Sequence, residues 1–290
     1  MKLTESSQNA WYNFLANQDN YGHADRKLQA QDINSHVQTC WHSALSTANR
    51  IRSDLNNFEP RRILEIGSST GLNCFALQTI YPHTEIIGIE PEHEAVVTAH
   101  SMTTQSNKRA PIFSQGYGEK LSIEDASVDL IICHTVIEHV QDVEKVIQEM
   151  ARVLAPGGYV HLEAPNYFWP YEPHLRIWCL PLLGKASVNF MGKLQGQKRN
   201  LNFLNHLQFV TPWRLEKCFK QNGLDWNNRV KQKLVNSLQG NTSQVKAYKR
   251  IAMMLRLIKK IGLEQLLIKI VMRAAFYPSV LYTLHKPNNG

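Results

Sequence analysis

Short apolar runs alternate with amphipathic stretches through the first half of the chain. The runs are rich in Ile, Val and Leu, which favours strands, whereas the stretches between them repeat apolar residues at three- and four-residue steps, which favours helices. This pattern predicts strands at 62–67, 85–90, 111–116, 128–134 and 158–165, and helices at 72–81, 92–103 and 143–154. Because strands and helices alternate, we expect a doubly wound α/β fold with a mostly parallel sheet covered on both faces.

The segments that flank this pattern differ from it. Residues 31–58 have a helical period that stops before Pro60, whereas residues 1–28 allow no assignment. After Asn166 the chain is aromatic and polar without a clear period, and a helix, a basic amphipathic pattern and a last strand follow. We therefore predict a helical extension at 1–58 and an α/β domain at 59–290, which includes a cap at 167–210, a helix at 212–223, a helical insertion at 243–275 and a strand at 278–287.

The charge of the chain is concentrated in one segment. The 290 residues carry a formal net charge of +8, yet residues 243–275 alone hold eight Lys or Arg against the single acid Glu264. A local basic element of this kind makes a nucleic-acid partner improbable as the main function. Its amphipathic pattern allows contact with an anionic membrane or with an acidic partner or substrate. The alternative is a helical insertion that packs its apolar face on the domain and leaves its charges in solvent.

Cysteine usage and hydropathy point to a cytoplasmic protein. The five cysteines are scattered and form no CxxC pair, so we expect free thiols in a reducing compartment. The polar N-terminus has no secretory signal pattern, and no apolar run reaches the length of a membrane span. A location at the inner face of the membrane stays open through the basic segment.

A glycine-rich turn follows the first predicted strand, in the stretch ILEIGSSTG from Ile63 to Gly71. A strand that enters a helix through such a turn brings backbone N–H groups close to a ligand. Glu90 ends the next predicted strand, where a carboxylate can accept both hydroxyls of a ribose. The sequence therefore predicts a site for a cofactor that contains a nucleoside.

Five motifs in order extend this prediction. EIGSSTG, IGIEPE, GYGEKL, VDLIICHTVIEHV and LAPGGYVHLEAPN resemble those of class I S-adenosylmethionine-dependent methyltransferases, over about Arg61 to Asn166. The resemblance implies a Rossmann-like, mostly parallel seven-stranded sheet and S-adenosyl-L-methionine as the cofactor. It also implies cofactor-binding residues, which are Glu65, Gly67, Ser68, Ser69 and Gly71 in the loop, Glu90 and Pro91 at the ribose, Gly118 and Glu119 at the adenine, and His134 and Thr135 at the methionine.

Two positions depart from the family pattern. Ser69 stands where the family loop usually has a glycine, although its backbone N–H remains available. Tyr117 stands where the family often has an aspartate beside the adenine, so the contact to the adenine amino group is in question. These departures keep open the alternative of an inactive methyltransferase fold that serves as an interaction module.

Methyl transfer to a hydroxyl requires a base, and histidine is the simplest one near neutral pH. We expect His139 as the first candidate and His174 as the second, with His139 placed one turn into the helix after the fourth strand. The alternative is that Glu138 and His139 only cap and pack that helix. A subset of the family binds a divalent ion through an ExxEH pattern, but Thr135 occupies the first ligand position here, so we predict no metal.

The cap is the predicted site of the methyl acceptor. It begins where the fifth strand ends, which is the edge at which open α/β sheets bind ligands. Its aromatic and polar residues suit a sugar or ring, and we name Tyr167, Trp169, Glu172 and Arg176 as substrate-binding. The EPH stretch is similar to that of family members in bacterial surface-glycan pathways. The expected acceptor is a hydroxyl of a glycan, lipid-linked sugar or secondary metabolite, with a quinone or small aromatic acceptor as the alternative; a hydrophobic cap without substrate contact also stays open.

Overall fold

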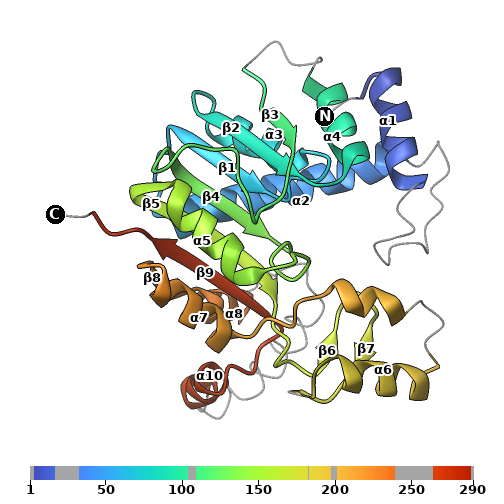
Figure 1. Cartoon of the computed structure of the whole chain (residues 1–290), viewed down its shortest axis with the longest axis vertical. Helices are drawn as coiled ribbons and strands as arrows, with labels where there is room; N and C mark the ends of the chain where they lie inside the picture. Colours follow the sequence, from blue (N-terminus) through green and yellow to red (C-terminus); the bar gives the residue numbers. More distant parts are fainter. Residues whose placement is uncertain are drawn as a thin grey trace.

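A seven-stranded sheet organises the structure, which is a computed structural model that describes residues 3–16, 33–103, 109–181, 183–196, 201–238 and 264–288 (Figure 1). The strand order is β3-β2-β1-β4-β5-β9-β8. Pairing is parallel from β3 to β5, whereas β9 runs antiparallel to both of its neighbours. The strands are β1 (Arg62–Ile66), β2 (Glu85–Glu90), β3 (Ile112–Gln115), β4 (Val128–His134), β5 (Leu154–Pro165), β8 (Asp225–Asn228) and β9 (Ser279–His285). The predicted doubly wound α/β fold with a mostly parallel sheet is confirmed.

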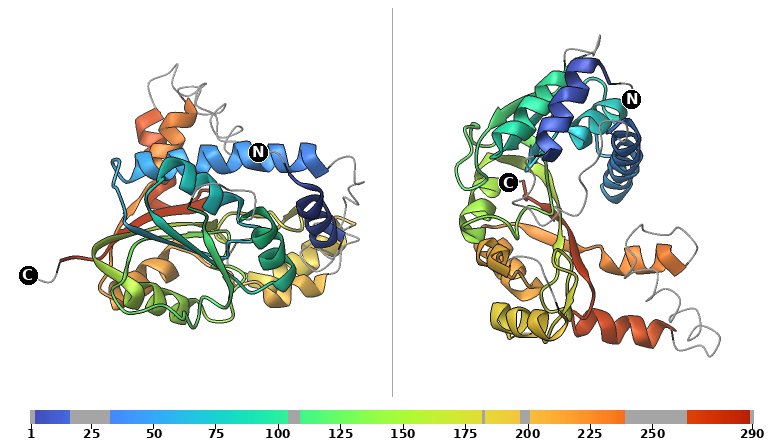
Figure 2. Two further views of the ribbon diagram at one scale, coloured as in Figure 1. Left: turned by 90° about the horizontal axis from the view of Figure 1, so that it is seen from above. Right: turned by 90° about the vertical axis from the view of Figure 1, so that its right-hand side faces the viewer.

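Both faces of the sheet are buried, because successive residues of the central strands enter different cores. Ile63 of β1 packs with the core on one face and Leu64 with the core on the other, and Leu130 and Ile131 of β4 divide in the same way. On one face lie α2 (Ile33–Asp54), α3 (Leu72–Ile80) and α4 (His93–Thr103), and on the other lie α5 (Val143–Val153) and α7 (Pro212–Gln221). The left view of Figure 2 shows α2 and α5 on opposite sides of the sheet. Continuous apolar strands are the expected consequence of a sheet covered twice.

The N-terminal extension is helical, as predicted. Residues that the sequence left unassigned include α1 (Glu5–Ala16), which packs on α4 through the buried Trp11 and Phe14. α2 packs on α3 and spans the region predicted at 31–58. The extension thus shares the core of the sheet face that it covers.

The cap contains regular structure, so the expectation of an aperiodic segment at 167–210 is wrong. A small hairpin of β6 (Tyr171–Glu172) and β7 (Ile177–Trp178) is followed by α6 (Gly184–Leu194) and a 3₁₀ helix, η3 (Leu201–His206). Two-residue strands are too short to show an alternating pattern. In α6 the apolar Phe190 and Leu194 are exposed, which blurs its helical period.

The C-terminal part completes the sheet with β8 and β9 and adds α8 (Val230–Leu238) and α10 (Glu264–Arg273). The predicted last strand is confirmed as β9, whereas β8 and α8 were not predicted. Of the predicted basic insertion at 243–275, only α10 and the residues after it fall within the described residues. In the part of the chain that the structure describes, no helix combines the length and the apolar character needed to cross a membrane.

Candidate active site

The carboxyl ends of β1, β2, β4 and β5 meet at one edge of the sheet, because these strands are parallel neighbours. The glycine-rich turn, Glu90, His134 and the start of the cap follow these four strand ends. The candidate residues therefore gather at the edge where the sequence predicted them.

The glycine-rich turn is held tightly against the sheet. The N–H groups of Gly67 and Ser68 both donate to the Ile89 carbonyl, at 2.8 and 3.1 Å. Gly67 has φ +71°, and a Cβ at this position would lie 2.2 Å from Cγ2 of Val136. Gly71 has φ +80°, and a Cβ there would lie 2.5 Å from a ring carbon of Phe113. Only glycine satisfies both the left-handed backbone and the close approach at these two positions.

Glu90 links the turn to the end of β2. Its Oε2 accepts the N–H of Ser69 at 2.8 Å and its Oε1 accepts the N–H of Glu92 at 3.1 Å. The side chain is buried, and burial raises the pKa of this carboxyl above its ordinary value. Each oxygen accepts one backbone donor and retains acceptor capacity, which matches the two hydroxyls of a ribose.

Glu65 lies under the turn and anchors the start of α3. Its oxygens accept from Asn73 Nδ2 at 3.1 Å and from the Cys74 thiol at 2.9 Å. Burial raises the pKa of the Glu65 carboxyl to about 7. Its contacts place it as support for the turn.

Two small cavities flank the turn and the end of β3. One, of about 200 Å³, lies between α2 and the turn. It is lined by Cys40, Ser43, Ala44, Ser68, Ser69, Thr70, Leu72 and Asn73. The other, of about 230 Å³, is lined by Tyr117, Glu119, Gln141, Asp142 and Lys145. Glu119 also accepts the backbone N–H of Gln141 at 2.7 Å, and the adjoining Gly118 is buried. The backbone carbonyl of Pro91 accepts a hydrogen bond from Nε2 of Gln115. The predicted adenine residues thus line or adjoin the second cavity.

A chain of polar groups starts at His134 and runs through the buried His161, and sequence reasoning missed all of its other members. His134 Nε2 lies 2.7 Å from His161 Nδ1, and His161 Nε2 lies 3.0 Å from Asp54 Oδ2. Burial lowers the pKa of both histidines. His161 sits inside an apolar strand and Asp54 ends a helix far away in sequence, so no local motif marks either residue.

A second, partly buried network lies next to this chain. Glu163 of β5 pairs with Arg50 of α2 at 2.6 Å and with Lys233 of α8 at 2.5 Å, and its backbone carbonyl accepts the N–H of Thr135 at 2.7 Å. Burial raises the pKa of Glu163, but the charges of Lys233, Arg50 and His134 outweigh it and hold this pKa well below its ordinary value. Thr135 has φ +52°, so the backbone after β4 turns sharply at the candidate methionine position.

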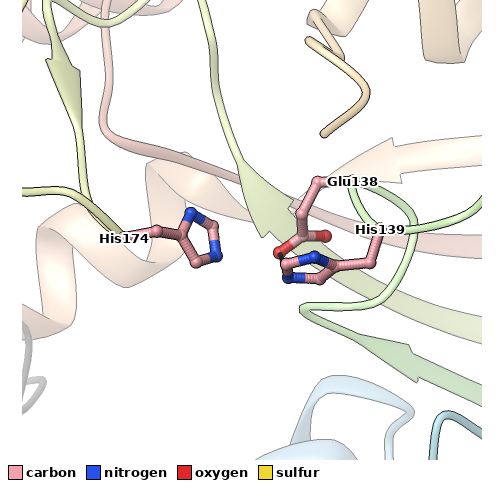
Figure 3. Close-up of side chains that lie close together, drawn as sticks. All are labelled: Glu138, His139 and His174. Atoms are coloured by element: carbon pink, nitrogen blue, oxygen red, sulfur yellow. Dashed lines mark ion pairs between the residues drawn. The ribbon is translucent and has the colours of Figure 1, made fainter. Parts of the chain in front are cut away.

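The two candidate bases lie together, and Glu138 lies beside them (Figure 3). The ring centroids of His139 and His174 are 5.0 Å apart at an interplanar angle of 85°. His139 belongs to the turn between β4 and α5, so its predicted place one turn into a helix is wrong. His174 comes from the cap, where its Nδ1 lies 2.6 Å from Oε1 of the buried Glu172.

The electrostatics of this cluster follow from burial. Burial raises the pKa of the Glu138 carboxyl to about 7. Burial alone lowers the pKa of His174, but its hydrogen bond to Glu172 and the charges of Glu172 and Glu138 raise it overall. The charge of the Glu138 carboxylate favours the protonated form of His174, and a protonated His174 favours the ionised form of Glu138.

The predicted substrate residues occupy different environments. Glu172 is buried beside His174, as described above, and Tyr167 is buried and stacked on Phe209 at 4.1 Å. Trp169 is partly exposed and contacts Phe276, and Arg176 is exposed at the hairpin turn with φ +58°. The structure therefore brings Glu172 to the histidine cluster and places Tyr167 in the core.

A methyltransferase-domain family model matches residues 64–162, which span β1 to β5 and the turn, Glu90 and Glu138–His139. This part of the chain is a class I S-adenosylmethionine-dependent methyltransferase domain. The methyltransferase match ends before the cap, so the family model covers the predicted cofactor residues and leaves His174 outside.

Individual relatives match a similar share of the chain. An uncharacterized methyltransferase, YcgJ, of Bacillus subtilis is 32% identical over 114 residues, which are 39% of this chain and 44% of YcgJ. Norajmaline N-methyltransferase of Rauvolfia serpentina is 35% identical over 101 residues, 34% of each chain. The chain thus spans less than half the length of these curated relatives.

Solved structures extend the likeness in fold beyond the matched sequence. The crystal structure of YcgJ has a TM-score of 0.52 at 19% identity and covers 86% of this chain and all of YcgJ. Phosphoethanolamine N-methyltransferase 2 of Haemonchus contortus, in complex with S-adenosyl-L-methionine, has a TM-score of 0.50 at 15% identity over 83% of this chain and 53% of its own. These similarities establish the Rossmann-like methyltransferase fold.

Proposed function

We propose that this protein transfers the methyl group of S-adenosyl-L-methionine to a hydroxyl of a glycan, a lipid-linked sugar or a secondary metabolite. The family assignment and the cofactor bound in the Haemonchus contortus neighbour support the cofactor. The carboxylate of Glu90, with capacity left on both oxygens, supports a ribose at the end of β2. Cofactor, acceptor and base would then meet at the strand ends.

One observation favours a hydroxyl over other acceptors: the Glu138, His139 and His174 cluster next to the end of β4. Amines and thiolates are nucleophiles without further help, whereas a hydroxyl must lose its proton as the methyl group arrives. A buried carboxylate and two imidazoles are the groups that this chemistry needs. The cluster is therefore assigned to the acceptor hydroxyl.

The acceptor class rests on the cap, because the family domain is shared by relatives with different acceptors, as their names state. Three aromatic rings of the cap, Trp169, Tyr171 and Trp178, are partly or well exposed. Exposed rings bind the apolar face of a sugar, with polar groups beside them for its hydroxyls. A quinone or small aromatic acceptor would stack on the same rings and is the second candidate.

The test is methyl transfer from labelled cofactor into fractions of a host extract, followed by identification of the labelled product. We expect label in a glycan, glycolipid or metabolite ether, and loss of about 10²–10⁴-fold in rate for His139→Ala and His174→Ala with unchanged cofactor affinity. Label in an amine or thioether would refute hydroxyl transfer. Failure to bind S-adenosylhomocysteine would favour the inactive interaction module.

We also propose peripheral contact with an anionic membrane from the cytoplasmic side. α6 and α10 lie at the same end of the molecule in Figure 1 and in the right view of Figure 2. Exposed apolar side chains, Phe190, Leu194, Leu266 and Ile270, occur on these helices together with the exposed Lys193, Lys269 and Arg273. Such faces bind interfaces through apolar insertion and charge. Sedimentation with phosphatidylglycerol vesicles but not with neutral vesicles is expected, and equal recovery from both would contradict this contact.

A further inference from the structure

The Glu138 side chain is an unusual buried group. It is 0% exposed, and neither carboxylate oxygen accepts a hydrogen bond from any residue that the structure describes. Leaving a buried carboxylate without partners costs free energy, and such groups are normally paired or bound to a metal. His139 approaches it as an ion-pair partner, but its Nε2 lies 3.9 Å from Oε1, too far for a hydrogen bond.

Two imidazoles face this carboxylate. Figure 3 shows His174 approaching from the cap, opposite Glu138 and His139, which stand side by side. One ligand atom from each of the three residues lies within 4.8 Å of the other two. Ligands of a tetrahedral ion at about 2.0–2.1 Å are ~3.4 Å apart, so small side-chain rotations suffice to close the set.

A second carboxylate orients the histidine from the cap. Oε1 of Glu172 accepts from His174 Nδ1 at 2.6 Å, and Oε2 of Glu172 accepts the N–H of Leu175 at 2.5 Å. With the proton on Nδ1, the lone pair of His174 is on Nε2, which is the nitrogen that can bind a cation. Histidine ligands of metals are commonly oriented by a carboxylate in this way.

We propose that Glu138, His139 and His174 bind a divalent first-row transition metal ion such as Zn²⁺, with Glu172 as a positioning residue. The donor set of two imidazoles and one carboxylate suits such ions, and three protein ligands leave a coordination position for an exogenous oxygen. The expectation of no metal counted only ligands within the TVIEH motif, whereas the third ligand comes from the cap.

The role of the ion rests on the proposed function. The acceptor hydroxyl occupies the open position, and coordination lowers its pKa so that its proton passes to water. The resulting oxygen anion attacks the methyl carbon, an O–C bond forms, the C–S bond of the sulfonium breaks, and S-adenosylhomocysteine leaves as a neutral thioether. The imidazoles then serve as ligands, and no separate base is needed.

The experiment uses the full chain without an affinity tag, stripped with a chelator and dialysed. Calorimetric titration with Zn²⁺, and in separate arms with Mn²⁺ and Mg²⁺, is expected to show one ion per chain for Zn²⁺ or Mn²⁺ and weak binding of Mg²⁺. Glu138→Gln and His174→Ala should weaken binding at least about 100-fold, and Glu172→Gln about 10–100-fold. The exposed His93 is the control, and His93→Ala should bind as the wild type does.

Two further readouts separate binding from folding and from catalysis. Zn²⁺ should raise the melting temperature of the wild type but not of Glu138→Gln, whose metal-free form should melt no lower than the metal-free wild type because a buried charge has been removed. X-ray absorption should show two nitrogens and at least one oxygen at about 2.0–2.1 Å. Absence of Zn²⁺ and Mn²⁺ binding, or unchanged affinity in Glu138→Gln and His174→Ala, would overturn the site.

Methyl transfer that is insensitive to a chelator would overturn the role of the ion while the proposed function stands. Conversely, because metal binding is measured without cofactor or acceptor, a failure to find any methylated product leaves the metal result unaffected. S-adenosylhomocysteine affinity, measured on the same stripped preparation, should be unchanged.

Discussion

Replacement of Glu90 by alanine should weaken cofactor binding strongly. The carboxylate holds the N–H groups of Ser69 and Glu92, at 2.8 and 3.1 Å, and has capacity for two ribose hydroxyls. Loss of two charge-assisted bonds to a ribose costs about 2–4 kcal/mol, which corresponds to roughly 30- to 700-fold in affinity. Glu90→Gln keeps one acceptor oxygen and should fall between the wild type and Glu90→Ala.

The measurement is calorimetric titration with S-adenosylhomocysteine, with circular dichroism to verify that each variant is folded. Glu124→Ala is the matched control, because it removes the same charge from an exposed site before the start of β4, away from the strand ends. Affinity of Glu90→Ala within about threefold of the wild type would refute the ribose assignment, since no bound ribose could then depend on that carboxylate.

Three further outcomes follow from packing and burial. Gly67→Ala should destabilise the fold by about 2–4 kcal/mol in thermal unfolding, because its Cβ would clash with Val136 at a positive φ, and an unchanged melting temperature would contradict this. Burial lowers the pKa values of His134 and His161 in the folded protein, so the unfolded chain takes up protons at a higher pH. The free energy of unfolding should therefore fall as the pH drops below about 6.5. An unfolding free energy that stays constant between pH 7 and 5 would contradict this prediction. Backbone amides of the cap at 167–210 should exchange faster than those of β4 in the empty protein and gain protection with acceptor, whereas equal protection would make the cap fixed structure.

The sheet could be predicted where burial alone decides the structure. β2 and β4 begin and end at the predicted residues, because their apolar runs are buried on both faces and need no information from elsewhere. β8 escaped prediction because its sequence DWNN is polar, and it becomes a strand only through pairing with β9. The hairpin of the cap is likewise a product of tertiary contacts.

The residues of the candidate site likewise fall into those that local sequence marks and those that only tertiary packing brings together. Glu90 and the glycine-rich turn are marked by local sequence, since one strand–turn–helix unit builds the whole feature. Asp54 and His161 are brought to His134 by the packing of α2 against the sheet, which no local spacing encodes. Glu138 was noticed beside His139, but its lack of hydrogen-bond partners is visible only in three dimensions.

The position of Glu163 has a consequence for the order in which the site is assembled during synthesis. Arg50, 113 residues before it, is already present when Glu163 leaves the ribosome, whereas Lys233 follows 70 residues later. A nascent chain that contains every family motif therefore still exposes a half-neutralised carboxylate at the end of β5. The strand-end edge therefore reaches its final charge balance only after α8, which supplies Lys233, has been made and docked. This is well after synthesis of the family-matched sequence, which ends at residue 162.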